Sequence, residues 1–105
     1  SGFIEVKGVT LEKNGVALFP DAPTLRGTKH MLELAKAVQK GYSGIILFVV
    51  QMKGCYSFTP NIEMDKTFTE ALLKAAQQGV QILAYDSIVK ANELVLGNPL
   101  PVVLS

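Results

Sequence analysis

The stretch GIILFVVQ, residues 44–51, decides the fold class of this chain. Its six consecutive apolar residues, Ile45 to Val50, are typical of a central strand in a sheet that is covered on both faces. Gln51 marks the polar end of the strand, where binding residues of α/β proteins often gather. The run is much shorter than the roughly 20 apolar residues that cross a bilayer, so no membrane span is expected.

Helical periodicity lies on both sides of this strand. The segment before it begins at an expected N-cap, Thr24, and ends at Gly41 as the C′ residue. Its apolar stripe, with spacings of three and four, consists of Met31, Leu34, Ala35 and Val38. The segment after it is capped by Asp65 and stopped by Gly79. Its core-facing residues are predicted to be Phe68, Leu72, Ala75 and Ala76.

Strand-like segments surround the helices. Residues 3–11 (FIEVKGVTL) are rich in β-branched and aromatic residues and lead into Asn14-Gly15, a dipeptide typical of tight hairpin turns. The other predicted strands are residues 16–19 and 80–85, with short edge strands at 88–96 and 102–104. Residues 52–64 are predicted to be a loop. The order ββαβαβ predicts an α/β fold in which helices sandwich a mixed sheet.

Length and composition limit the classes of protein to which the chain can belong. With 105 residues, 49% of them hydrophobic, it is expected to fold as a single domain and is not of the disordered class. A lone Cys55 and a lone His30 argue against thiol catalysis and a His-based zinc site, and the single cysteine favours a reducing compartment, the cytoplasm. A net charge of +1 gives no sign of strong nucleic-acid binding by the whole domain.

The first strand carries the pair that is best suited to catalysis. Residues two apart in a strand share a face, so Glu5 and Lys7 project together. A carboxylate is a ligand for Mg²⁺, and a lysine beside it can stabilise the charge that develops on a phosphorane-like transition state. This chemistry suits phosphodiester hydrolysis. An ordinary ion pair between the strands explains the same two residues equally simply.

A second group of polar residues stands around the start of the first helix: Asp21, Thr24, Arg26 and His30. Helix N-termini favour anions, and arginine binds phosphate through two nitrogens, so a phosphate or a metal-bound water fits here. The alternative is that Asp21 and Thr24 cap the helix, Arg26 pairs with an acid and His30 is an ordinary half-buried residue. For Asn61 and Asp65, loop stabilisation and capping compete with a functional role in the same way. Tyr56 and Phe58 are candidates for base stacking or for anchoring their loop to the core.

The stretch ALFPDAPTLRGTKH (residues 17–30), together with IEVKGVTL, ILFVVQ and the FTPN segment that reaches EMD, resembles the sugar fermentation stimulation protein A family. The resemblance runs through essentially the whole chain. It implies a restriction-endonuclease-like PD-(D/E)xK domain, preceded in the family by an OB-like domain. It also implies an association with DNA binding and with the regulation of sugar utilisation.

Residue by residue, the resemblance makes Glu5 and Lys7 the catalytic ExK element, with the Val6 carbonyl and Asp21 as further metal ligands. The implied cofactor is Mg²⁺ or Mn²⁺, and the implied phosphate or nucleic-acid ligands are Arg26, His30, Thr24 and Gln51. The family's preceding strand bears an Asp that has no counterpart here. We therefore expect residues 1–105 to be a single nuclease-like domain, an N-terminally truncated fragment of a longer chain that is inactive by itself.

Three functions remain open at this stage. The first is a metal-dependent nuclease that acts on DNA or another nucleic acid when intact. The second is a non-catalytic, nonspecific DNA-binding regulator of sugar (maltose) metabolism. The third is a small α/β interaction module that uses no metal. Fold resemblance alone does not decide among them.

Overall fold

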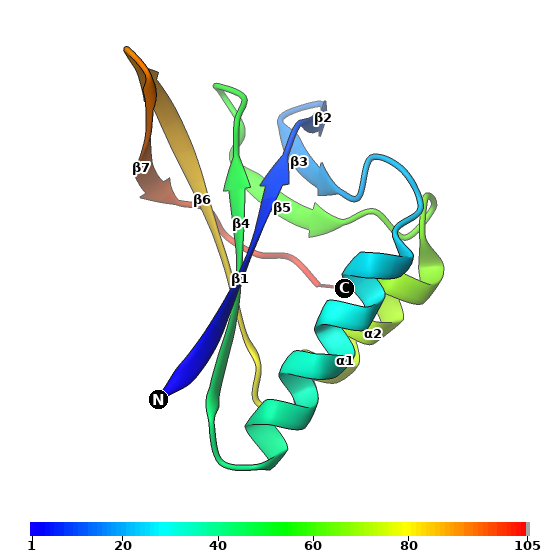
Figure 1. Cartoon of the computed structure of the whole chain (residues 1–105). Helices are drawn as coiled ribbons and strands as arrows, with labels where there is room; N and C mark the ends of the chain where they lie inside the picture. The colour runs from blue at the N-terminus through cyan, green and yellow to red at the C-terminus, as the bar shows by residue number, and fades with distance from the viewer. Residues whose placement is uncertain (105) are drawn as a thin grey trace.

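The computed structural model describes residues 1–104 and shows two helices packed beside two sheets (Figure 1). In chain order the elements are β1 (Gly2–Val9), β2 (Leu11–Lys13), β3 (Val16–Phe19), α1 (Leu25–Gln39), β4 (Ser43–Val50), β5 (Ser57–Pro60), α2 (Lys66–Gln77), β6 (Gln81–Lys90) and β7 (Glu93–Pro99). The larger sheet has the order β1-β4-β6-β7, and the smaller one has the order β2-β3-β5. Strands β1, β4 and β6 are parallel, while β7 runs antiparallel to β6. The predicted mixed α/β architecture is confirmed.

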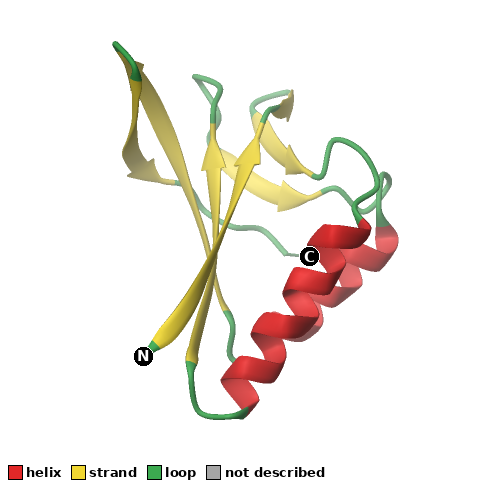
Figure 2. Ribbon diagram, viewed as in Figure 1, coloured by secondary structure: helices red, strands yellow, loops and turns green. Residues whose placement is uncertain are grey.

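Both helices lie on the same side of the larger sheet (Figure 2). On that side the β4 residues Ile46 and Phe48 are fully buried. Ile45 and Leu47, which alternate with them, are only half-buried. The expectation that helices cover both faces is therefore wrong for residues 1–104, because an unbroken apolar run does not tell which face receives the helices.

The helix boundaries agree with the predicted caps. Thr24 Oγ1 accepts a hydrogen bond from the Gly27 N–H at 2.9 Å, and Asp65 Oδ1 accepts one from the Phe68 N–H at 2.9 Å. The second oxygen of Asp65, Oδ2, accepts from the Thr24 N–H at 2.8 Å. One carboxylate thus ties the starts of α1 and α2 together.

The segment predicted as one strand over residues 3–11 is two strands. β1 ends at Val9, and β2 begins at Leu11 in the other sheet. The predicted hairpin turn is confirmed between β2 and β3, since Asn14 and Gly15 have φ values of 54° and 84°. The ring of Tyr56 packs directly over Gly15, where a Cβ would stand 2.5 Å from Cε2 of the ring.

Two other regions differ from the prediction. The loop expected over residues 52–64 contains β5, which pairs with β3 on one side and meets the C-terminal tail at Val102 on the other. The edge strand expected over residues 88–96 is divided by a turn, so that its halves belong to the β6–β7 hairpin. The first difference comes from long-range pairing that no local pattern in the sequence reports, whereas the second comes from a local turn between Lys90 and Glu93.

The core lies between the helices and the two sheets. Phe58 is fully buried and stacks on Phe48 with ring centroids 4.3 Å apart, so Phe58 anchors its segment and is not available to stack on a base. Phe19 extends this aromatic group toward Phe68 of α2, with ring centroids 5.3 Å apart. The predicted helix stripes are buried except for Val38 and Ala76, which are partly buried. No helix within residues 1–104 is long and apolar enough to cross a membrane.

Candidate metal and phosphate site

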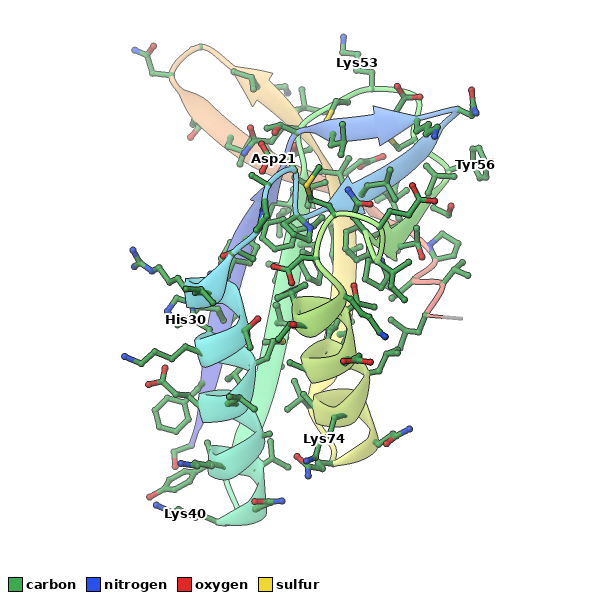
Figure 3. All side chains as sticks on the ribbon, turned by 90° about the vertical axis from the view of Figure 1, so that its right-hand side faces the viewer. Asp21, His30, Lys40, Lys53, Tyr56 and Lys74 are labelled. Atoms are coloured by element: carbon green, nitrogen blue, oxygen red, sulfur yellow. The ribbon has the colours of Figure 1, made fainter. Side chains whose placement is uncertain are left out.

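Three polar side chains meet where α1 passes over β1. Glu5 and Lys7 project from β1 toward the helix side, since both contact His30. His30 comes from the second turn of α1, where Figure 3 labels it. His30 Nδ1 lies 2.9 Å from Glu5 Oε1 and 2.8 Å from Lys7 Nζ, and Lys7 Nζ lies 3.5 Å from Glu5 Oε1. We call these three residues the Glu5-Lys7-His30 cluster. The predicted pair on β1 is thus joined by one member of the predicted helix group.

The cluster has a conflict in its hydrogen bonds. A protonated Nδ1 of His30 can donate to Glu5, and then it offers no lone pair to the Lys7 ammonium. An unprotonated Nδ1 can accept from Lys7, and then it faces Glu5 as one acceptor faces another. The ammonium has three donors, so in this second arrangement Lys7 can still donate to Glu5 as well. His30 Nδ1 therefore forms a hydrogen bond with either Glu5 or Lys7, but not with both at the same time.

The cluster lies at the border between the core and solvent. The side chains of Lys7 and His30 are 14% and 18% exposed, whereas that of Glu5 is 31% exposed. Glu5 and His30 open onto a cavity of about 390 Å³ between β1 and α1. The cavity is lined by Phe3, Ile4, Glu5, His30, Glu33, Leu34 and Ala37. Glu33, which is exposed on α1, was missed as a neighbour of the site, although its place three residues after His30 was a usable signal.

The Val6 carbonyl points away from β4, toward the free edge of the sheet. The carbonyls of Ser1 and Val9 accept from β4-side amides, those of Ser43 and Gln51, at 3.3 and 2.9 Å. In a parallel ladder alternate residues bond to alternate sides, so the N–H and C=O groups of Ile4, Val6 and Gly8 face outward. β1 is the terminal strand of its sheet within residues 1–104, and its outward groups have no strand partner there.

The oxygen atoms that the site offers as metal ligands suit a hard cation, but there are few of them. A carboxylate and a backbone carbonyl are the oxygen ligands that Mg²⁺, Mn²⁺ and Ca²⁺ accept. Both contacts of Glu5 use Oε1, which leaves Oε2 for a cation. In the part of the chain that the structure describes, no three His, Cys, Asp or Glu side chains come together as a metal cluster. The residues fit a cation whose remaining ligands come from water or from outside this set.

The other residues predicted around the helix start make none of the contacts of the cluster. Arg26 is exposed, one turn before His30, and no carboxylate of residues 1–104 pairs with it, so the predicted ion pair is not formed. The hydroxyl of Thr24 is used in capping. Asp21 is exposed in the loop that precedes α1 (Figure 3) and contributes no cap. Arg26 is the member of this group with its charge free for a phosphate.

Gln51 lies on the opposite face of the sheet. Its Nε2 is 2.9 Å from the position that a Cβ would take on Gly8, and Gly8 faces away from Glu5 and Lys7. The structure therefore does not bring Gln51 to the cluster. Asn61 donates from Nδ2 to the Pro20 carbonyl at 2.9 Å, which together with the two bonds of Asp65 gives these residues structural roles.

Cys55 is half-buried and lies outside the cluster. Burial raises the pKa of its thiol above the ordinary value of 9.0, and the carboxylates of Glu12 and Asp86 raise it further. A thiol must ionise to act as a nucleophile. The environment of Cys55 therefore disfavours the thiolate form.

Comparison with known proteins identifies the family. The family described as the sugar fermentation stimulation protein RE domain matches residues 1–93. The chain belongs to this family. The sugar fermentation stimulation protein homolog of Alkaliphilus oremlandii is 57% identical over 97 residues, which are 92% of this chain and 41% of that protein. A homolog from Clostridium botulinum is 52% identical over 100 residues, 95% of this chain and 44% of that protein.

A solved structure of the family confirms the fold. Pyrococcus furiosus SfsA, solved in complex with Ca²⁺, matches with a TM-score of 0.88 at 29% identity, over 96% of this chain and 44% of that one. The restriction-endonuclease-like fold class predicted from the sequence is therefore confirmed. The chain spans less than half the length of each of these relatives.

Proposed function

We propose that this sugar fermentation stimulation protein domain binds DNA and supplies one part of a metal-dependent site for phosphodiester hydrolysis. The observation that carries the proposal is the Glu5-Lys7-His30 cluster, which joins a carboxylate, an ammonium and an imidazole within 3.5 Å at a sheet edge. Such a combination is what hydrolysis of an anionic ester requires: a ligand for a cation, a positive charge and a residue that positions them.

Each residue has a separate role in this proposal. Glu5 Oε2 and the Val6 carbonyl hold the cation, which when bound polarises a phosphoryl oxygen and lowers the pKa of a bound water. Lys7 neutralises negative charge on the phosphorane-like transition state. His30 orients Lys7 or Glu5, and Arg26 binds a neighbouring phosphate of the DNA backbone. Neither Thr24, whose hydroxyl caps α1, nor Gln51, on the other face, has a part in it.

The choice of cation is also a proposal. Pyrococcus furiosus SfsA was solved with Ca²⁺, an ion that takes oxygen ligands. We propose Mg²⁺ or Mn²⁺ for catalysis, because these ions accept the same oxygen donors. The cytoplasm is the proposed location, on the basis of the single cysteine, and a link to sugar utilisation is proposed from the family description alone.

DNA binding is tested with this chain itself. Fluorescence anisotropy with a labelled duplex, measured over a series of salt concentrations, is expected to show weak, salt-dependent binding. Replacing Arg26 by Ala removes one phosphate contact and should reduce the slope of log K against log salt by about 1. Replacing Lys40, at the far end of α1, by Ala is the matched control and should leave the slope unchanged. If the Arg26 and Lys40 variants have equal slopes, the DNA does not contact Arg26.

Hydrolysis is tested in a chimera. The matched region of the Alkaliphilus oremlandii relative is replaced by this chain, and supercoiled DNA is incubated with Mg²⁺ or Mn²⁺. We expect cleavage that requires the cation and is lost in Glu5→Gln and Lys7→Met, while both variants keep the melting temperature of the parent. A folded chimera that cuts no DNA with either cation contradicts the hydrolysis proposal.

One observation favours a second function, nonspecific DNA binding without turnover. The described residues hold no cluster of three metal-ligating side chains, and the net charge of +1 suits only moderate affinity. This function predicts that the chimera binds DNA but does not cut it, and that Glu5→Gln changes neither property. If the chimera neither binds nor cuts DNA, the remaining candidate function is the interaction module that uses no metal.

A further inference from the structure

The two helices enclose a groove that is separate from the Glu5-Lys7-His30 cluster. α1 and α2 contact each other and lie side by side with their C-terminal ends together, near the labels of Lys40 and Lys74 (Figure 3). Between them is a cavity of about 280 Å³ that shares no lining residue with the cavity beside Glu5. We call it the interhelix groove. The residues that line it have no part in the proposed metal site.

The floor of the interhelix groove is apolar. It is formed by two larger side chains and three alanines: Met31, Leu32, Ala35, Ala71 and Ala75. The alanines leave space between the helices that larger side chains would fill. Leu32 keeps 50% of its surface exposed at the side of the groove. The floor therefore offers apolar surface on which a ligand can be buried with a gain in free energy.

One end of the groove is cationic. The last turns of the helices supply a lysine and a glutamine each, which are Lys36 and Gln39 from α1 and Lys74 and Gln78 from α2. In the part of the chain that the structure describes, no acidic residue lines the groove, and neither lysine forms an ion pair. A lysine in the last turn complements the helix dipole, which explains each lysine by itself. It does not explain why both line the same cavity.

These features together define the chemistry of a ligand. Two ammonium groups attract a carboxylate or a phosphate, and glutamine amides donate further hydrogen bonds to its oxygens. The apolar floor favours an aliphatic or aromatic body, whereas a nucleic-acid backbone would match only the lysines. Pockets for drug-sized ligands begin at about 300 Å³, so the volume of the groove suits a small molecule.

We propose that the interhelix groove binds a small organic anion, a carboxylate or phosphate on a short apolar chain. The anionic group lies between Lys36 and Lys74, and the chain lies on the apolar floor beside Leu32. Such a ligand bridges the C-terminal ends of α1 and α2, as Asp65 connects their N-terminal ends. The inference does not rest on the proposed function, because no residue of the groove belongs to the Glu5-Lys7-His30 cluster.

Calorimetric titration of this chain with decanoate and with decyl phosphate tests the proposal. We expect saturable one-to-one binding, and the tighter of the two anions identifies the preferred head group. Lys36→Gln and Lys74→Gln should each weaken binding about threefold to fivefold, the upper range for a partly solvated ion pair. Leu32→Gln should weaken it as well, because the chain loses apolar contact. Decyltrimethylammonium, which has the same chain and the opposite charge, should bind at least about tenfold more weakly.

Two other lysines provide matched controls. Lys29 on α1 and Lys66 on α2 are exposed, and neither lines the groove. Lys29→Gln and Lys66→Gln make the same change in net charge and should leave the affinity within about twofold of the parent. Equal weakening by all four lysine variants would indicate attraction to the overall charge and would overturn the proposal. Absence of saturable binding of both anions at millimolar concentration also overturns it.

Nuclear magnetic resonance locates the ligand without any substitution. Decanoate should shift the amide signals of residues 31–39 and 71–78 most strongly, with the same Kd as in calorimetry. The largest shifts in β1, where Ile4 and Val6 are 64% and 56% exposed, would place the ligand on the sheet and contradict the proposal. Dimers in ultracentrifugation that Leu32→Lys disrupts, with no shifts in the groove on addition of decanoate, would assign the groove to a second copy of the chain instead.

Discussion

Asp65 offers the sharpest test of how the two helices are held together. Its two oxygens have different tasks, since Oδ1 accepts from the Phe68 N–H to cap α2 and Oδ2 accepts from the Thr24 N–H at the start of α1. Asp65→Ala removes both bonds. Asp65→Asn keeps an oxygen for the cap but places an N–H₂ donor against the N–H donor of Thr24. The two variants therefore separate capping from the connection between the helices.

The expected magnitudes follow from these contacts. Loss of an N-cap acceptor costs about 1 kcal/mol, and a hydrogen bond to a charged acceptor contributes about 1.5 kcal/mol or somewhat more. Asp65→Ala is thus expected to lower the free energy of unfolding by about 2–3 kcal/mol, and Asp65→Asn by about 1–1.5 kcal/mol. For a domain of this size these values correspond to falls in Tm of about 10–15 °C and about 5–8 °C.

Thermal and urea unfolding followed by circular dichroism measure both changes. Asp21→Ala, an exposed carboxylate in the neighbouring loop, is the control and should stay within about 0.5 kcal/mol of the parent. If Asp65→Asn is as stable as the parent, the bond to Thr24 contributes nothing and the proposed connection is wrong. If Asp65→Ala keeps its stability but loses DNA binding, Asp65 belongs to the binding surface instead.

Three other changes test the core, the hairpin and the thiol. Phe58→Ala should lower the free energy of unfolding by about 3–5 kcal/mol in a urea titration, because the ring is fully buried. Tyr56 is exposed, so Tyr56→Ala should lower it by less than about 1 kcal/mol. Similar values for both variants would contradict the assigned burial. Gly15→Ala should cost about 1–3 kcal/mol, since φ is 84° and the new Cβ would press on Tyr56; an unchanged melting curve would refute the turn geometry. Because the pKa of Cys55 is raised, the fraction of the thiol present as thiolate is lower than for a free thiol at the same pH. The rate of labelling by a disulfide reagent at pH 8 should therefore be lower in the folded chain than in the urea-unfolded chain, and it should increase with pH until the thiol is ionised. Equal labelling rates at pH 8 would disagree with the raised pKa.

The parts of the fold that local chemistry determines were predictable. Thr24 and Asp65 cap, and Asn14-Gly15 turns, because their side chains or their positive φ values act over three or four residues. β5 was missed because Ser57-Phe58-Thr59-Pro60 is short and ends in a proline, so that its alternation is a weak signal, and because its pairing partners lie about 40 residues away in both directions along the chain. The uncovered side of β4 was missed because a run of apolar residues does not indicate which element packs on each face of the strand.

The site was predicted to a smaller extent. The period of two in a strand places Glu5 beside Lys7 and was sufficient for that pair. The approach of His30 depends on how α1 crosses β1, which is a tertiary property, and sequence reasoning assigned His30 to a phosphate together with Arg26 instead of to the ExK pair. Gln51 was placed near the site because it ends β4, but a side chain at a strand end can turn to either face.

The shared Nδ1 of His30 makes this part of the molecule locally frustrated. Glu5 and Lys7 cannot both have their best bond to the ring, so the resting arrangement satisfies one at the expense of the other. A cation that engages Glu5 would release the ring to Lys7, and an anion that engages Lys7 would release it to Glu5. The two ligands thus favour opposite bonds of the ring, so by linkage the exchange of His30 couples the two sites negatively and works against the attraction between the bound cation and the anion.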